Sequence, residues 1–354
     1  MLCEMVKTNT AIRCVVELAY IWYLRGGLVH IPNDHYDNMF GEAQHSIDRN
    51  SPEIWDQEHQ DFIHNAVPVS VHAHNDYLHR IPLFEALGSG CISVEADIHL
   101  SEAALLVAHT DVGLRGEKTL RSMYLDPLRR IIGAQNDFAP LSGDDWKGIY
   151  NKSPKQTIVL LVDHKTAGAE TFEELDRQLQ PLRDLDYLTY WNSTARIMRP
   201  LTIVASGEAP FESILNMTDF HRDIFWDAKL ERLSSTQDNF DVEPPIFRYN
   251  ISNSYFASTR WQNARLWRTE LDPSEPEPPA SPALQDLYAG DIEQAEARGL
   301  ISRYWDTPAS PPNVQEIAWR VQLEQKVGIL NMDDLAVVRA RATGWGLGRS
   351  SELR

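Results

Sequence analysis

The chain has 354 residues, a formal net charge of −18 and 43% hydrophobic residues, a composition typical of a globular protein. A single α/β barrel commonly fills about 250 residues, so one domain with extensions is expected. The acidic balance disfavours a protein that binds the phosphate backbone of nucleic acids, which needs clustered Lys and Arg. An acidic enzyme can still act on an anionic substrate if a bound cation reverses the local field.

Residues 1–65 lack a strand–helix rhythm and are predicted to form an extension before the main domain. Their segment 10–27, TAIRCVVELAYIWYLRGG, is apolar but interrupted by Glu17, so an amphipathic helix or a degraded signal-anchor fits better than a full membrane span. Four Asn-x-Ser/Thr sequons mildly favour a secretory route. Secretory, membrane-associated, mitochondrial and cytoplasmic locations all stay open.

Residues 66–345 alternate short apolar runs with helical patterns, which predicts a mainly parallel sheet. The strand candidates are VPVSVHAH, CISVEADI, LLVAH, TIVLLVDHK, PLTIVASG, DIFWDAKL, FRYNISNSYF, GLISRYW and VGILNMDDL. With about eight strands, a (β/α)8 TIM barrel is the most economical closure. An open doubly wound sheet is the rival, but no GxGxxG follows the first strand. The Pro-rich stretch 272–282 is predicted to be a surface insertion, and 346–354 a polar tail.

Ionisable residues stand where the first four predicted strands end, which is the catalytic end of such a barrel. The first ends in His72 and His74, the second in Glu95 and Asp97, the third in His109, and the fourth in Asp163 and Lys165. Alternation along a strand places the two members of each pair on one face. Four such ends in register predict one shared site.

Three carboxylates buried together would be costly without a cation, because desolvation and like-charge repulsion add up. Glu95, Asp97 and Asp163 offer only oxygen ligands, which suit Mg²⁺, or alternatively Ca²⁺. Zinc fits less well, since no thiolate accompanies them.

The histidines and the lysine supply the other functional groups that phosphodiester cleavage needs. We predict that His74 and His109 are the general acid–base pair, because imidazole titrates near neutrality. His72 is the second candidate for the role given to His74, or a group that orients His74. Lys165 would add a positive charge for the phosphate.

The motifs HAHNDY, RIPLFEALGSGCISVEADI, LLVAHTD and VLLVDHKT resemble the glycerophosphodiester phosphodiesterase-like barrels of the phospholipase-C-like superfamily. Within it, the chain is most similar to the fungal altered inheritance of mitochondria protein 6 family, over roughly residues 66–340, and more distantly to venom sphingomyelinase D. The resemblance implies that His74 and His109 are the catalytic histidines and that Glu95 and Asp97 are metal ligands. It also implies a third ligand, Asp163, as in the sphingomyelinase D branch, with Lys165 beside it.

The chain departs from the glycerophosphodiesterase pattern directly after His74. Asn75 and Asp76 stand in place of the Arg-Gly of that family's His-Arg-Gly motif, and its Glu-Asn-Thr element is absent. Asn75, Asp76, Arg80 and Trp305 are further candidates for substrate contacts, and Arg303 is as good a replacement as Arg80 for the missing arginine. Asp333 and Asp334 are expected to cap the helix that follows them.

The sequence therefore predicts a metal-dependent phosphoric diester hydrolase or lyase that acts on a glycerophosphodiester or a phospholipid, with possible contact to a membrane surface. An amidohydrolase-like metal enzyme is one alternative, because His-x-His can also bind metal at a first barrel strand. It would need histidines at the ends of later strands, and PLTIVASG and DIFWDAKL offer none. The other alternative is an inactive barrel that serves as a binding or organelle-inheritance factor.

Overall fold

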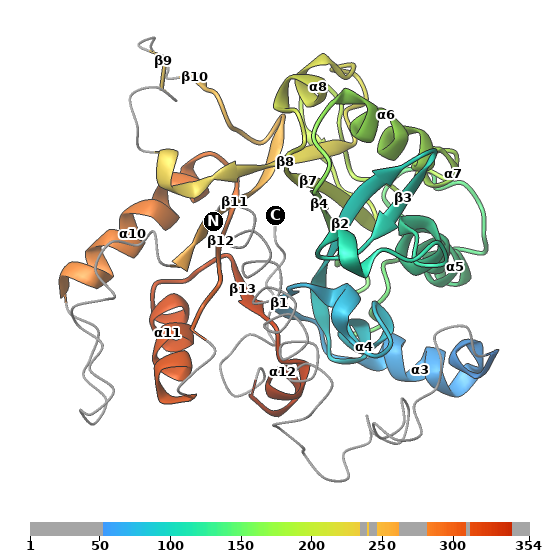
Figure 1. Cartoon of the computed structure of the whole chain (residues 1–354), viewed down its shortest axis with the longest axis horizontal. Coiled ribbons are helices and arrows are strands. Elements are labelled where there is room, and N and C mark those ends of the chain that lie inside the picture. The colour runs from blue at the N-terminus through green and yellow to red at the C-terminus, as the bar shows by residue number, and fades with distance from the viewer. Residues whose placement is uncertain (1–51, 234–238, 241–245, 262–281, 309–311, 342–354) are drawn as a thin grey trace, which may run out of the picture.

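The structure is a computed structural model that describes residues 52–233, 239–240, 246–261, 282–308 and 312–341 (Figure 1). The predicted segment 10–27, the Pro-rich stretch 272–282 except Pro282, and the tail 346–354 lie outside these residues. Within the described part, no helix is both long and apolar enough to span a bilayer.

Eight parallel strands form a closed barrel, which confirms the predicted fold. The strand order is β1-β13-β12-β11-β8-β7-β4-β2, and β2 pairs with β1 to close the ring. The strands are β1 (Val69–Ala73), β2 (Cys91–Ser101), β4 (Ile158–His164), β7 (Leu201–Gly207), β8 (Ile224–Lys229), β11 (Ser254–Arg260), β12 (Ile301–Trp305) and β13 (Ile329–Met332). Their side chains alternate between the barrel interior and the surrounding helices.

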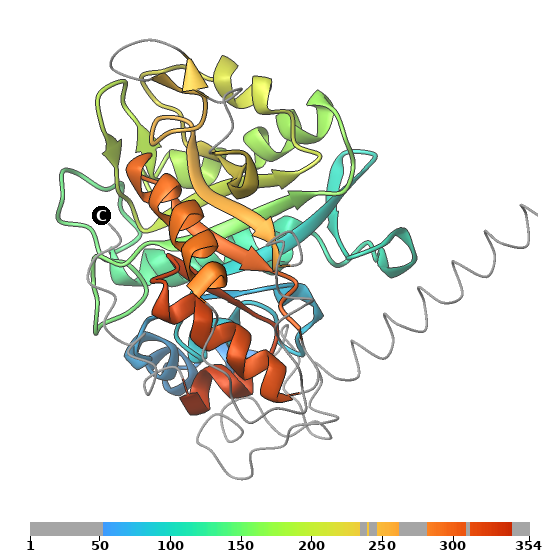
Figure 2. The same ribbon diagram turned by 90° about the vertical axis from the view of Figure 1, so that its left-hand side faces the viewer.

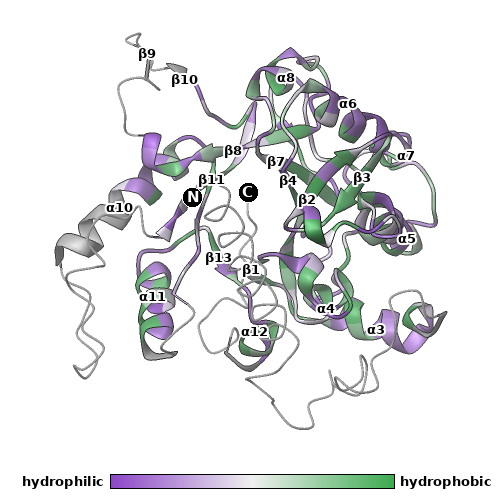
Figure 3. Cartoon of the chain, viewed as in Figure 1, coloured by the Kyte–Doolittle hydropathy of each residue, from purple (hydrophilic) through white to green (hydrophobic). Residues whose placement is uncertain are grey.

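Helices surround the ring of strands, as Figure 1 shows. The α-helices are α3 (Gln57–Asn65), α4 (Phe84–Gly88), α5 (Asp126–Gln135), α6 (Ala169–Gln178), α7 (Gln180–Arg183), α8 (Phe211–Asn216), α10 (Pro282–Ala297), α11 (Pro312–Glu324) and α12 (Leu335–Arg341). In α5 the buried side chains Leu128, Ile131 and Ile132 recur at helical spacing, with Pro127 in the first turn. Apolar residues (green in Figure 3) accordingly gather in the strands and on the helix faces toward them.

Short elements complete the fold. The single-turn helices are η2 (Pro52–Trp55), η3 (Asp76–Leu78), η4 (Asp111–Gly113), η5 (Arg121–Leu125) and η6 (Leu230–Arg232). Two small antiparallel pairs lie outside the barrel, β5 (Tyr190–Trp191) with β6 (Arg196–Ile197), and β9 (Asn239–Phe240) with β10 (Ile246–Phe247). Residues 52–65, assigned from the sequence to the extension, contribute Ile54 and Ile63 to the hydrophobic core.

The segment LLVAH was expected to be the third barrel strand, and this prediction is wrong. Its strand, β3 (Ala104–Val107), runs antiparallel to the end of β2 and forms a hairpin that extends beyond the barrel (Figure 2). Only Glu102 and Ala103 separate the two strands. A connection this short permits a hairpin but not the crossover that parallel strands need. His109 therefore reaches the site from a hairpin.

The run FRYNISNSYF was placed too early. β11 begins at Ser254 and overlaps only its last three residues. Before it, Asn250 and Asn253 hold a turn, since their side-chain oxygens accept backbone hydrogen bonds from Ser252 and Asn250, respectively. Asparagine favours such turns over strands because its side chain competes for backbone donors.

Candidate active site

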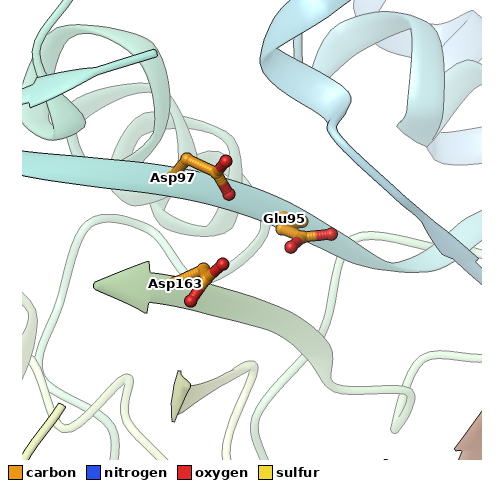
Figure 4. A group of neighbouring side chains, drawn as sticks. All are labelled: Glu95, Asp97 and Asp163. Atoms are coloured by element: carbon orange, nitrogen blue, oxygen red, sulfur yellow. The ribbon is translucent and has the colours of Figure 1, made fainter. Parts of the chain in front are cut away.

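Three carboxylates converge at the C-terminal end of the barrel. Glu95 and Asp97 are one alternation apart on β2, and Asp163 lies beside Asp97 on β4, in direct register (Figure 4). One oxygen of each lies within 4.8 Å of one oxygen of both others. All three are largely withdrawn from solvent, and Asp97 is fully buried. The sequence prediction that neighbouring strands bring these groups together agrees with this geometry.

The donor set fits a hard divalent cation. Asp97 Oδ1 and Asp163 Oδ1 are buried without a hydrogen-bond partner among the described residues. Buried polar atoms are normally paired, so two such oxygens in one carboxylate cluster are a notable departure. Carboxylate oxygens are the preferred ligands of Mg²⁺ and Ca²⁺. Glu95, Asp97 and Asp163 are the residues that would hold the ion.

Lys165 supplies the positive charge that lies closest to the cluster. Its Nζ lies 3.0 Å from Asp97 Oδ2 and 2.5 Å from Asp163 Oδ2. Burial opposes the charge of Lys165, but the two aspartates outweigh it and raise the pKa of the lysine above its usual range. For Asp163, burial dominates, and despite Lys165 its pKa rises to about 6. One ammonium thus only partly compensates three carboxylates.

Gly207, at the end of β7, allows Asp163 its position. The backbone of Gly207 has φ +66°, and a Cβ there would lie 1.9 Å from Asp163 Oδ1. Both the conformation and the close approach favour glycine.

His74 lies between two carboxylates. Its Nδ1 is 2.7 Å from Asp333 Oδ1, and its Nε2 is 3.6 Å from Glu95 Oε2. Burial disfavours the charged imidazole, but Glu95 and Asp333 outweigh it and raise the pKa of His74 to about 9. The expected capping role holds for Asp334, whose Oδ1 accepts from the backbone of Ala336. Asp333 instead orients His74, a role that the sequence prediction missed.

His109 has a comparable partner. Its Nδ1 lies 3.0 Å from Asp97 Oδ2 and 3.0 Å from the hydroxyl of Tyr77, and its side chain is half exposed to the pocket. With Nδ1 engaged by a carboxylate in both histidines, Nε2 is the nitrogen that each can offer to a ligand.

His72 is fully buried and does not reach the pocket. Its Nε2 lies 3.2 Å from Glu95 Oε2, and its Nδ1 lies 2.7 Å from the hydroxyl of Ser93. Burial, with the charge of Arg303, lowers the pKa of His72 to about 4, so the neutral ring donates to Glu95. His72 therefore orients a candidate ligand and does not line the space where a substrate would lie.

The remaining candidates divide into two groups. Asn75 and Trp305 line the pocket, whereas Asp76 and Arg80 do not. Asp76 is buried behind β1, where its Oδ2 accepts hydrogen bonds from the backbone of Leu83 and the hydroxyl of Tyr124. Arg80 Nε lies 3.6 Å from Glu85. The structure thus does not bring Arg80 to the site.

Arg303 is the arginine that does reach the pocket. From β12 it donates to Ser258, to Asn331 and to Asp227 Oδ2, the last at 3.0 Å. The guanidinium is nearly buried, and its strand β12 lies across the ring from β4, which carries Asp163. It is held rigidly enough to present its remaining N–H groups in a fixed direction.

These side chains share one cavity of about 730 Å³. Its lining includes His74, Glu95, His109, Asp163 and Lys165, together with Ser206, Asp227, Ser258, Arg303 and Trp305 from the later strands and the loops that follow them. Most of the residues that line it are polar or charged. The cavity can therefore hold a polar, charged group larger than a single phosphate.

Comparison with known proteins places this barrel in a family. The profile of the AIM6-like phosphodiesterase domain matches residues 60–227. An altered inheritance of mitochondria protein 6 homolog of Arthroderma benhamiae is 32% identical over 284 residues, which cover 78% of this chain and 84% of the relative. The chain belongs to the altered inheritance of mitochondria protein 6 family. The family member of Eremothecium gossypii is 32% identical over 77% of this chain and 69% of its own length.

A solved structure is also similar to this member of the altered inheritance of mitochondria protein 6 family. It is a glycerophosphoryl diester phosphodiesterase from Parabacteroides distasonis, with 12% identity, a TM-score of 0.42, and coverage of 83% of this chain and 93% of that one.

Two site residues of this family member were not singled out from the sequence. Asp333 follows β13 and meets His74 across 259 positions of the chain. Tyr77 lies in HAHNDY, the same motif as His74, and its hydroxyl reaches His109. The only sequence signal for Tyr77 was its presence in that polar motif.

Proposed function

We propose that the protein is a divalent-cation-dependent phosphodiesterase that cleaves a glycerophosphodiester or a phospholipid at the headgroup phosphate. Three features support this: the family's phosphodiesterase-type domain, the carboxylate cluster, and two histidines that line the same cavity. The observation that carries the proposal is that His74 and His109 each hold a carboxylate at Nδ1, Asp333 and Asp97, beside one acidic cluster.

The two imidazoles suit the two proton transfers that the reaction needs. One accepts a proton from the attacking hydroxyl as its oxygen bonds to phosphorus, and the other donates a proton to the departing oxygen. If water attacks, the products are a phosphomonoester and an alcohol. If a neighbouring hydroxyl of the substrate attacks, the products are a cyclic phosphate and an alcohol. The Nδ1 carboxylates keep Nε2 directed at the reacting oxygens.

The cation and the basic side chains would bind the phosphate and balance its negative charge. When bound, a divalent ion supplies positive charge that neutralises the phosphate oxygens. Lys165 adds a cation on the same side, and Arg303 adds one from β12, across the ring from β4. A diester between these groups would meet positive charge from two directions, which is the requirement for stabilising the developing negative charge.

The experiment is a substrate panel. Purified protein is incubated with glycerophosphodiesters and lysophospholipids, with Mg²⁺ or with EDTA, and the products are followed by ³¹P NMR, which separates phosphomonoester from cyclic phosphate. We expect turnover only with Mg²⁺, and a loss of about 10²–10⁴-fold in His74→Ala or His109→Ala. Asp97→Asn should lose both activity and the response to Mg²⁺.

His221→Ala is the matched control, because this histidine precedes β8 at the other end of the barrel and stacks on Tyr190. Turnover in EDTA, or His74→Ala as active as His221→Ala, would contradict the proposal. No turnover of any diester by well-folded protein that binds Mg²⁺ would favour the non-catalytic alternative, a barrel that acts as a binding factor.

A further inference from the structure

The hydroxyl of Tyr77 joins three groups of the candidate active site. It lies 2.6 Å from Asp97 Oδ2, 2.5 Å from Asn75 Oδ1 and 3.0 Å from His109 Nδ1. The ring is almost completely buried. Tyr77 does not line the cavity, so it would not touch a substrate there.

The turn after β1 delivers this hydroxyl. Asn75 adopts the left-handed conformation, with φ 50°, and precedes the short helix η3, which contains Tyr77. Asparagine tolerates this conformation better than most residues. The chain reverses there, so His74 faces the cavity while Tyr77 reaches behind Asp97. The HAHNDY motif thus places His74 beside Glu95 and Tyr77 against Asp97, two of the three carboxylates of the cluster.

The two oxygens of Asp97 have different surroundings. Oδ2 is reached by Tyr77, by His109 Nδ1 at 3.0 Å and by Lys165 Nζ at 3.0 Å. Oδ1 is buried and has no hydrogen-bond partner among the described residues. A carboxylate that rotated about its terminal bond would exchange these positions. The shortest contact at Oδ2, the one from Tyr77, opposes that rotation most.

We propose that Tyr77 is a positioning residue that fixes the carboxylate of Asp97, so that Oδ2 orients His109 while Oδ1 stays available for the cation. This inference rests on the proposed function, because it takes His109 as an acid–base group and Asp97 as a ligand. In this role the hydroxyl of Tyr77 links the proposed cation ligand Asp97 to the proposed acid–base group His109.

The chemistry of the phenol agrees with this role. Burial, together with Asp97 and Glu95, raises the pKa of Tyr77 well above its usual value, so the hydroxyl keeps its proton. A phenol has a single hydrogen to donate, and an ionised carboxylate is a stronger acceptor than an amide oxygen. The hydrogen therefore goes to Asp97, and the amide of Asn75 then directs its NH₂ group, which is exchanged with its oxygen by a flip, to the phenol oxygen. His109 Nδ1–H can then donate to the phenol oxygen or to Asp97, and either bond fixes the same tautomer.

The test is Tyr77→Phe, which keeps the ring and removes only the hydroxyl. The control is Tyr150→Phe, which removes an equally buried hydroxyl that bonds to the Cys91 carbonyl at the start of β2. Mn²⁺ binding to the whole chain is measured by electron paramagnetic resonance, and turnover is measured in parallel. Partners that orient metal ligands typically contribute about 10–100-fold in metal affinity or activity. We expect Tyr77→Phe to weaken Mn²⁺ binding and kcat by about that factor, and Tyr150→Phe to leave both unchanged.

Two failures are distinguishable. Wild-type protein that binds no Mn²⁺ would overturn the proposed function. Wild-type protein that binds Mn²⁺ and turns over, with Tyr77→Phe equal to Tyr150→Phe in both measurements, would overturn only the role of Tyr77. If Tyr77→Phe does not fold, NMR of the wild type decides. A slowly exchanging Tyr77 hydroxyl proton with a nuclear Overhauser effect to the His109 ring supports the inference, and its absence contradicts it.

Discussion

Replacing Lys165 with methionine tests how strongly the carboxylate cluster needs positive charge. Methionine keeps most of the length of the lysine side chain and removes its ammonium. In the present arrangement that ammonium is the cation nearest to Asp97 and Asp163, at 3.0 Å and 2.5 Å. Without it, two buried or nearly buried carboxylates face each other and Glu95 with no compensating lysine.

The expected size follows from the burial of the pair. Removing one partner of a buried ion pair typically costs about 3–5 kcal/mol of the free energy of unfolding. The side chains of Lys165 and Asp163 are 26% and 15% exposed, so solvent screens part of the interaction. We therefore expect a loss near the lower value, about 3 kcal/mol, in EDTA. For a chain of 354 residues, with an unfolding entropy of about 2.1 cal/mol/K per residue, that corresponds to a fall in Tm of roughly 4–5 °C.

The assay is thermal unfolding with and without Mg²⁺. A cation that binds one site of the folded state only raises the free energy of unfolding by RT ln(1 + [Mg²⁺]/Kd). Lys165→Met should gain more from Mg²⁺ than the wild type does, because the variant carries one more uncompensated negative charge at the cluster. Lys229→Met is the control, since Lys229 lines the same cavity from β8 but is exposed. It should change neither Tm nor the Mg²⁺ response appreciably.

The reasoning would be refuted if Lys165→Met unfolded at the wild-type temperature in EDTA. It would equally be refuted if Mg²⁺ raised the Tm of Lys165→Met and Lys229→Met by the same amount.

Three further predictions test separate parts of the molecule. Burial raises the pKa of Asp76 to about 6, so the stability that its neutral form contributes is fully present below pH 4 and is lost as pH rises through 6. We expect the free energy of unfolding, measured in urea, to fall between pH 4 and pH 8 by about 3 kcal/mol less in Asp76→Asn than in the wild type. Gly207→Ala places a Cβ 1.9 Å from Asp163 Oδ1 and should abolish Mg²⁺ stabilisation in thermal unfolding, whereas Gly116→Ala, with no atom within 4 Å, should not. Asp333→Asn removes the carboxylate from His74 Nδ1, and steady-state kinetics should show kcat reduced about 10–100-fold, with no such loss in Asp334→Asn.

The barrel and its carboxylate cluster could be predicted from the sequence because both follow from local periodicity. Alternation along SVEAD and LVDHK places Glu95, Asp97, Asp163 and Lys165 on inward faces without any knowledge of the tertiary structure. The fold then joins strands in chain order, so adjacent strand ends meet. The apolar residues that precede these charged positions in each strand likewise predict that the strands are buried.

The connections between distant parts of the chain could not be predicted in the same way. Asp333 and His74 meet because β13 closes the barrel against β1, and the Asp-Asp pair alone fits a helix cap equally well. Tyr77 acts through a left-handed turn at Asn75 that a short polar motif does not specify. The hairpin of β3 was predictable, because the two residues between β2 and β3 are too few for a crossover. The regular alternation of strands and helices elsewhere in the chain led to the interpretation of LLVAH as a barrel strand.

The most direct test of the cation site is the anomalous scattering of Mn²⁺ in a crystal of the full chain. We predict one strong peak bounded by Glu95, Asp97 and Asp163, with carboxylate oxygens at about 2.0–2.6 Å, and no such peak in crystals of Asp97→Asn. A Mn²⁺-soaked crystal in which Lys165 still holds Asp97 and Asp163, and no peak lies between the three carboxylates, would contradict the account.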